Sequence, residues 1–183
     1  MPISKFPGSP STFPVVRISS KFPAASPESN DSGPQIMSGG SLYYRQLDDL
    51  ALTISVSKTI TDAGWLEFLE TTLRLARKIG RMPKVTMASF TSTYPDAKQR
   101  KMTRDFLASQ GVKPIDRLGL LSDNPLVRGA IVAFSWVVPN ANVLAFGSRD
   151  VATCLTWLHE VAIFDEKRAS TAWSEGRAAL HVR

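Results

Sequence analysis

A cluster of hydroxyl-bearing side chains lies at the end of the apolar run Val85–Phe90 and just before the dipeptide Pro95-Asp96. The cluster consists of Ser89, Thr91, Ser92, Thr93 and Tyr94. A turn that leads from a strand into a helix points backbone N–H groups and the positive end of the helix dipole at whatever binds above it. A phosphate on Ser92 would be stabilised at such a turn, with Lys98 and Arg100 about one helical turn away. The cluster is therefore the first candidate for a working site.

The same residues also have an ordinary structural interpretation. Ser, Thr and Tyr before Pro-Asp are common turn and capping residues, and Thr93 would cap a helix that begins at Pro95. Asp96 and the basic residues Lys98 and Lys101 would then belong to the first turns of that helix. The sequence leaves both interpretations open.

Catalytic and metal-binding patterns are weak in this chain. A Ser92–His159–Asp123 triad can be written down, but no pattern brings the three side chains together. The acidic pairs Asp48-Asp49 and Asp165-Glu166 are better explained as a turn and as a solvated pair than as metal ligands. No glycine-rich phosphate loop occurs. We therefore predict a protein that is not an enzyme and that needs no metal or cofactor.

The bulk composition is ordinary for a soluble globular protein. Of the 183 residues, 43% are hydrophobic and 21% are charged, and the net charge is +6. The basic residues form no run with interleaved aromatic residues, so nucleic acid is a disfavoured partner. No stretch approaches the ~20 apolar residues that a membrane span requires. The single cysteine, Cys154, excludes an internal disulfide and is predicted to be a buried thiol on a helix, which suits a cytoplasmic protein.

The chain divides into three compositional zones. Residues 1–40 are rich in proline and serine and are predicted to form a disordered tail. Residues 41–163 carry the patterns of a folded α/β domain, and residues 164–183 are predicted to be a charged tail that can form a helix. Met37 stands just before the folded pattern, so a translation start at Met37 rather than Met1 is an open alternative.

Within the folded zone, apolar spacing predicts alternating strands and helices. The predicted strands are Leu42–Leu47, Leu50–Val56, Val85–Phe90, Leu118–Leu121 and Asn142–Phe146, the first two joined as a hairpin through Asp48-Asp49. The predicted helices run from Thr61 or Asp62 to Ile79, from Pro95 to Gln110, over Leu126–Val138, and from Ser148 or Asp150 toward Phe164. The order β-β-α-β-α-β-α-β-α predicts an α/β fold with a mixed sheet of about five strands, four main helices and right-handed crossovers.

Two turns are expected to meet at one edge of this sheet. Ligand and partner sites in open α/β sheets lie at the carboxyl ends of strands, which is where the turns Ser89–Asp96 and Ser122–Asn124 fall. The helix over residues 126–138 is apolar nearly all round. This pattern favours a central packing role or, alternatively, a surface for a partner or for a second copy of the chain.

The element order resembles that of the STAS domain, the fold of bacterial anti-sigma-factor antagonists, over roughly residues 42–161. A divergent bacterial STAS-like group has a sequence similar to the segment Leu126-Val-Arg-Gly-Ala-Ile-Val-Ala-Phe-Ser-Trp136. In the antagonists, a Ser or Thr at the turn entering the second helix is phosphorylated, and the phosphate blocks binding to an anti-sigma kinase. The matching positions here are Thr91, Ser92 and Thr93, within Phe90-Thr-Ser-Thr-Tyr-Pro95, where the family has Asp, a hydroxyl pair and Gly.

The resemblance implies a non-enzymatic regulatory module that binds a protein partner, such as a kinase-like or other regulatory protein. The candidate residues for partner binding or phosphorylation are Thr91, Ser92, Thr93, Tyr94, Asp96, Lys98, Lys101, Ser122, Asp123 and Asn124. The alternative is binding of a small anionic ligand, a nucleotide or a lipid at the same strand ends.

Overall fold

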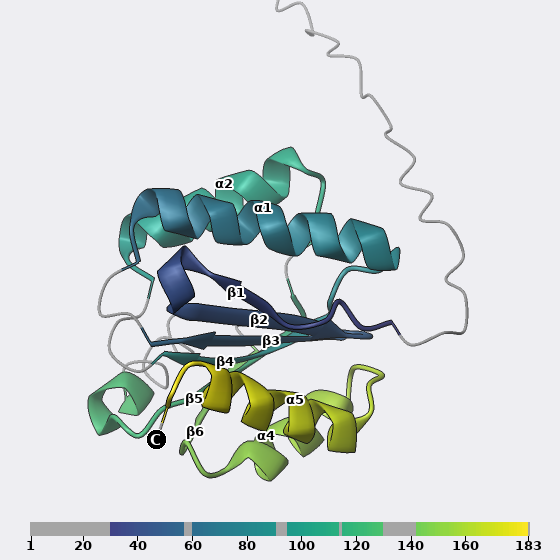
Figure 1. Ribbon diagram of the computed structural model, residues 1–183, viewed down its shortest axis with the longest axis vertical. Coiled ribbons are helices and arrows are strands. Elements are labelled where there is room, and N and C mark those ends of the chain that lie inside the picture. The colour runs from purple at the N-terminus through teal and green to yellow at the C-terminus, as the bar shows by residue number, and fades with distance from the viewer. Residues whose placement is uncertain (1–29, 57–59, 91–94, 114, 130–141, 183) are drawn as a thin grey trace, which may run out of the picture.

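A six-stranded sheet between two layers of helices forms the domain (Figure 1). The computed structural model describes residues 30–56, 60–90, 95–113, 115–129 and 142–182. The strands are β1 (Gln35–Met37), β2 (Leu42–Leu47), β3 (Leu50–Ser55), β4 (Val85–Phe90), β5 (Arg117–Leu121) and β6 (Val143–Phe146), and a short 3-10 turn, η1 (Ser38–Gly40), follows β1. The helices are α1 (Asp62–Ile79), α2 (Ala97–Ser109), α4 (Val151–His159) and α5 (Glu166–Ala179). The chain therefore has the predicted α/β fold.

The strands lie in the sheet in the order in which they occur in the chain. β2 and β3 form the predicted antiparallel hairpin, with Leu47 opposite Leu50, and β3, β4, β5 and β6 run parallel. Each parallel strand is added on the same side of the one before it, so right-handed crossovers place their helices on one face. Figure 1 shows α1 and α2 together on that face, with α4 and α5 on the other.

Local sequence signals set most of the element boundaries. The Thr61 hydroxyl accepts a hydrogen bond from the Gly64 N–H at 3.1 Å at the start of α1, and Gly80 ends the helix in a left-handed conformation with φ 76°. Both ends agree with the prediction. Residues 125–129 are helical, as predicted, whereas residues 130–138 of the predicted third helix lie outside the described residues.

The predicted disordered tail over residues 1–40 is wrong at its carboxyl end. β1 pairs antiparallel with β2, and Asp31 forms an isolated bridge with Leu47. Arg45 on β2 donates two hydrogen bonds to the Asp31 carboxylate, from Nε at 2.9 Å and from Nη2 at 2.6 Å. This long-range pair holds a segment whose composition alone would not order it. A chain that began at Met37 would lack these contacts.

Asp31 also makes the stability of the domain depend on pH. Partial burial alone would raise the pKa of Asp31, but hydrogen bonds from Arg45 and Gly33, with the charges of Arg45 and Arg168, bring it below its ordinary value. A carboxyl whose pKa is lowered by folding stabilises the folded state above its unfolded pKa of about 4, and this contribution disappears as the pH falls through the folded pKa. In urea titrations between pH 6 and pH 2, Asp31→Asn should remove part of the acid-side loss of stability. Equal pH slopes for the wild type and the variant would contradict the assignment.

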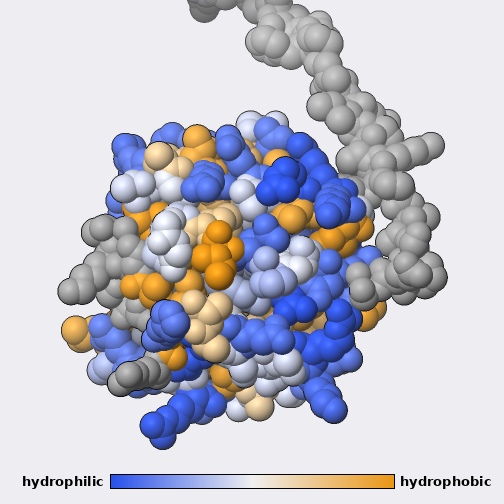
Figure 2. Space-filling view, in the orientation of Figure 1, coloured by the Kyte–Doolittle hydropathy of each residue, from blue (hydrophilic) through white to orange (hydrophobic). Residues whose placement is uncertain are grey.

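β1 is an edge strand, and the molecular surface there is mixed. Figure 2, in the orientation of Figure 1, shows hydrophobic residues intermingled with hydrophilic ones over this face. Ile36 on β1 is 53% exposed. A three-residue edge strand offers little length for pairing with another chain, which is one way in which proteins limit edge-to-edge association.

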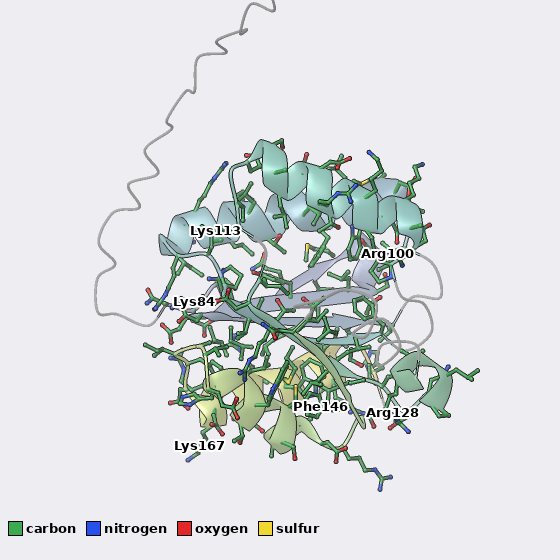
Figure 3. The ribbon with its side chains drawn as sticks, turned by 180° about the vertical axis from the view of Figure 1, so that it is seen from behind. Lys84, Arg100, Lys113, Arg128, Phe146 and Lys167 are labelled. Atoms are coloured by element: carbon green, nitrogen blue, oxygen red, sulfur yellow. The ribbon has the colours of Figure 1, made fainter. Side chains whose placement is uncertain are left out.

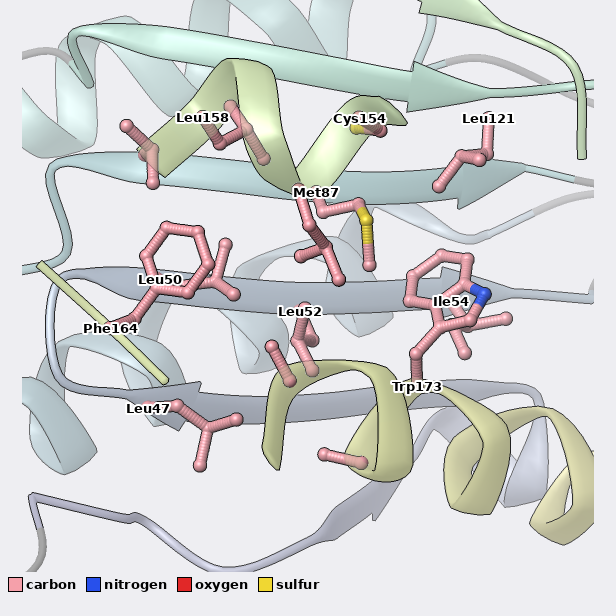
Figure 4. Close-up of a cluster of buried hydrophobic side chains, with 14 of the residues drawn as sticks. Leu47, Leu50, Leu52, Ile54, Met87, Leu121, Cys154, Leu158, Phe164 and Trp173 are labelled. Atoms are coloured by element: carbon pink, nitrogen blue, oxygen red, sulfur yellow. The ribbon is translucent and has the colours of Figure 1, made fainter. Parts of the chain in front are cut away.

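The prediction that residues 164–183 form a charged tail outside the domain is wrong, because α5 packs in the core. Phe164, Ala169, Ala172 and Trp173 are buried in the same cluster as the Leu side chains of β3. Figure 4 shows Trp173 beside Ile54, and Phe164 beside Leu50. At Gly176 the helix approaches β2 closely, because a Cβ at this position would lie 2.7 Å from the Tyr43 ring. The domain therefore extends through α5 instead of ending at residue 163.

The face of the sheet under α4 and α5 is tightly packed. Leu50, Leu52, Ile54 and Met87 are all at most 1% exposed. A methyl group at Gly119 would collide with the Cys154 sulfur, so this glycine lets α4 rest directly on β5. Burial raises the pKa of the Cys154 thiol to about 12. Cys154 is thus the buried thiol on a helix that its sequence context predicts.

A fully buried carboxylate, Asp49, ties three loops together at the amino-terminal edge of the parallel strands. Its Oδ2 accepts a hydrogen bond from the Ile163 N–H at 3.1 Å and lies 3.3 Å from the Lys84 ammonium. Its Oδ1 lies 2.6 Å from the Arg81 guanidinium, as an ion pair rather than an aligned hydrogen bond. The Asp49 carbonyl also accepts the N–H groups of Lys84 and Val85.

Candidate functional site

The candidate site lies where β4, β5 and β6 end, because parallel strands finish at one edge of the sheet. β4 ends at Phe90, beside the end of β5 at Leu121, and β6 ends at Phe146. The turn at residues 91–94 lies outside the described residues, so the structure does not place Thr91, Ser92, Thr93 or Tyr94.

Helix α2 begins at this edge with a complete capping box. The Asp96 carboxylate accepts the Gln99 N–H at 2.8 Å, and the Gln99 side-chain oxygen accepts the Asp96 N–H at 3.3 Å. The buried Gln99 amide also donates to the Ile60 carbonyl at 2.6 Å, which fixes α2 to the loop before α1. The predicted helix start at Pro95 and the predicted Thr93 cap are therefore wrong. Asp96 caps α2 in place of Thr93, because the Asp-x-x-Gln spacing satisfies two free N–H groups at once.

The cap also changes the electrostatics of the candidate site. The carboxylate of Asp96 already lies at the positive end of the α2 dipole and accepts one of its free N–H groups. A phosphate on the preceding turn would meet a negative charge there, so the helix end is a weaker anion site than its sequence suggests. This finding weighs against the small-anion interpretation of the turn.

Two basic residues of α2, Lys98 and Lys101, form ion pairs with acids of the same domain. Lys98 binds Asp62 at the start of α1, and this hydrogen bond raises the pKa of Lys98. Lys101 binds Asp105 at 2.5 Å, one turn further along α2. Both pairs are exposed and add little to stability. They leave α2 less positive than its composition alone predicts.

The second predicted turn, Ser122–Asn124, is held by its own side chains. The Asn124 side-chain oxygen accepts the Leu126 N–H at 2.9 Å, which makes Asn124 the predicted cap of the helical residues 125–129. Asp123 accepts hydrogen bonds from the Ser148 hydroxyl at 2.6 Å and the Ser148 N–H at 3.1 Å. These two bonds lower the pKa of Asp123. The turn after β5 is thereby tied to the turn after β6.

One large apolar side chain projects from this polar edge. Leu126 follows the cap residue Asn124 and is 81% exposed. Arg128, two residues later, donates to the Ser122 carbonyl at 2.7 Å, so the backbone that carries Leu126 is tied to the turn. Sequence reasoning assigned the helix over residues 126–138 to central packing or to a partner surface, and the exposure of Leu126 shows that this side chain does not pack in the core.

The triad Ser92–His159–Asp123 is not assembled. α4 starts at the edge where β6 ends and runs back across the sheet, so its last residue, His159, lies at the opposite edge from Asp123. His159 contacts the Phe164 ring at 5.2 Å between centroids and lies 3.9 Å from Glu166. Among the described residues no group of three or more His, Cys, Asp or Glu side chains could hold a metal ion. In the same part of the chain, no helix combines the length and apolarity that crossing a membrane demands.

Sequence reasoning missed an apolar cavity under α1 and α2. The cavity has a volume of about 690 Å³ and is lined by the helices and by the sheet face that they cover. On β3 and β4, four of the residues that point to this face are small, namely Ala51, Thr53, Thr86 and Ala88, whereas Phe90 at the end of β4 is large. The neighbouring positions that face α4 and α5 are Leu50, Leu52, Val85 and Met87. This alternation of small and large residues was the available signal.

Comparison of the chain with protein-family models, with curated proteins and with solved structures finds no match in any of the three.

Proposed function

We propose that the chain is a non-enzymatic regulatory module of the STAS kind, working in the cytoplasm, that binds a protein partner at the carboxyl-end edge of its parallel strands. The observation that carries the proposal is the highly exposed Leu126 beside the ordered polar turn Ser122–Asn124. A rigid apolar anchor surrounded by polar groups is typical of the centre of a protein interface. At the same edge of the sheet, Asp96 and Lys98 at the start of α2 add polar groups.

The resemblance to anti-sigma-factor antagonists supports the same edge. In that family the turn entering the second helix carries the regulatory phosphate, which here corresponds to Thr91, Ser92 or Thr93. A kinase-like or other regulatory protein is the proposed partner. Contact between two copies of the chain through residues 126–138 is a further proposal, and it would use the same exposed Leu126.

Leu126→Asp tests this proposal against a matched control, Ile163→Asp. Ile163 is 69% exposed but lies at the opposite edge of the sheet, beside Asp49. Affinity purification of the full-length chain from its own cells should recover one specific partner with the wild type and with Ile163→Asp. Leu126→Asp should weaken that interaction by about 30-fold, the effect of an interface anchor worth about 2 kcal/mol.

The same comparison can contradict the proposal. Equal binding by Leu126→Asp and Ile163→Asp would exclude the edge as the interface. Ser92→Asp places a negative charge on the turn and tests phosphoregulation separately. This variant should lower the affinity for the partner without changing the unfolding midpoint. Unchanged affinity in Ser92→Asp would remove phosphoregulation while leaving the interface intact.

A further inference from the structure

We infer that the cavity between the sheet and the helices α1 and α2 binds a long-chain fatty acid, with its carboxylate held by Arg100. The cavity's volume of about 690 Å³ lies within the range of ~300–1,000 Å³ that small-molecule sites occupy in proteins. The inference is independent of the proposed partner surface, because it rests on the cavity alone.

The interior of the cavity presents almost no free polar group. Its aromatic and aliphatic lining includes Trp65, Phe68 and Leu107. The Thr72 and Thr103 hydroxyls donate back to carbonyl groups of their own helices, Leu69 and Gln99, both at 2.9 Å. The Trp65 indole N–H is also satisfied, by the Thr103 oxygen at 2.9 Å. Water would find few partners in such a space, so the cavity favours an apolar occupant.

The cavity lining carries two charged side chains among the described residues, and both are positive. Among the described lining residues the charged ones are Arg100 and Lys113, and no Asp or Glu is present. Figure 3 shows the two cations near opposite ends of α2. An apolar interior with cations at its ends complements a molecule that has a hydrocarbon chain and one anionic head group. A nucleotide would bring polar base and ribose groups that this interior cannot satisfy.

Arg100 is the better placed of the two cations for a carboxylate. One of its terminal nitrogens, Nη1, donates to the Pro95 carbonyl at 2.6 Å, which fixes the side chain at the start of α2. The Nε and Nη2 groups have no partner among the described residues and remain available for a second acceptor. Arg100 also lies near the carboxyl ends of the strands, the edge at which open α/β sheets bind ligands. The hydrocarbon chain would then run beneath α2, which spans roughly 20 Å at 1.5 Å per residue.

Titration of the delipidated full-length protein with radiolabelled hexadecanoate, below its micellar concentration, tests the inference. We expect saturable binding and about a tenfold preference for hexadecanoate over hexadecanol. Arg100→Gln should abolish this preference, whereas Arg104→Gln, one turn along α2 and outside the cavity, should keep it. Ala88→Phe should fill the cavity and reduce binding at least tenfold, and Ala51→Leu replaces it if the first variant does not fold.

Three outcomes would overturn the inference. The first is an absence of saturable binding of hexadecanoate to the wild-type protein. The second is full binding by a folded Ala88→Phe or Ala51→Leu variant. The third is loss of the head-group preference in Lys113→Gln but not in Arg100→Gln, which would exclude Arg100 as the carboxylate site.

Discussion

Replacing Asp49 with alanine is expected to lower the free energy of unfolding by about 3 kcal/mol. The substitution removes the acceptor of the Ile163 N–H and separates the Asp49 carboxylate from Arg81 and Lys84. Hydrogen bonds to charged groups contribute about 1.5–3 kcal/mol each, and part of this is recovered because Arg81 and Lys84 can return to water. Three loops that meet at Asp49 would lose their common anchor.

Asparagine substitutions at two adjacent positions separate the charge of Asp49 from its size. Asp49→Asn keeps an acceptor for the Ile163 N–H but loses both ion pairs, so about half of the alanine effect should remain. Asp48→Asn is the matched control, because Asp48 has a positive φ of 51° that asparagine tolerates. Urea unfolding followed by circular dichroism measures all three variants. Equal losses in Asp48→Asn and Asp49→Asn would mean that the charge of Asp49 contributes nothing specific.

Trp173→Ala is expected to cost about 3–5 kcal/mol, the range for deleting a large buried aromatic side chain. Trp173 is 2% exposed and packs among the β3 side chains, so its loss opens a cavity between α5 and the sheet. Trp173→Phe should cost far less. It keeps an aromatic ring in place and removes a buried indole N–H that has no hydrogen-bond partner in the described part of the chain.

Unfolding midpoints and limited proteolysis together measure the Trp173 variants. Cleavage near residues 160–165, in the loop before α5, should accelerate in Trp173→Ala and stay close to the wild-type rate in Trp173→Phe. A Trp173→Ala variant with the wild-type midpoint would show that α5 contributes little to the core, against its observed burial.

Where local patterns dominate, the sequence predicts this fold well. The alternation in Leu50, Leu52 and Ile54 identifies a strand, and the Thr61 cap with Gly80 delimits α1. The sequence did not predict β1. The ion pair between Asp31 and Arg45 that stabilises this segment joins residues 14 positions apart, and no local pattern connects them. The sequence allowed a helix within residues 164–183 but did not place it in the core, because α5 contacts the sheet partly through small residues such as Ala172 and Gly176, which leave a weak apolar stripe.

The candidate site divides in the same way. Topology predicts that Ser122–Asn124 and the start of α2 share one edge, since both follow parallel strands. The pairing of Asp123 with Ser148 and of Lys98 with Asp62 depends on side chains 25 and 36 residues apart, which sequence spacing does not reveal. The α2 start is a different case, because the Asp96-x-x-Gln99 spacing was visible in the sequence and the competing Thr93 obscured it.

The position of α5 in the chain has a consequence for synthesis on the ribosome. Every strand of the sheet precedes residue 147, whereas the helix that covers Leu52 and Ile54 is made only from residue 166 onward. At about 5–20 residues per second, a few seconds pass between the synthesis of the last strand and that of the helix that covers this apolar sheet face. During this interval Leu50, Leu52, Ile54 and Met87 form a surface that a chaperone can recognise, and final folding waits for the last helix.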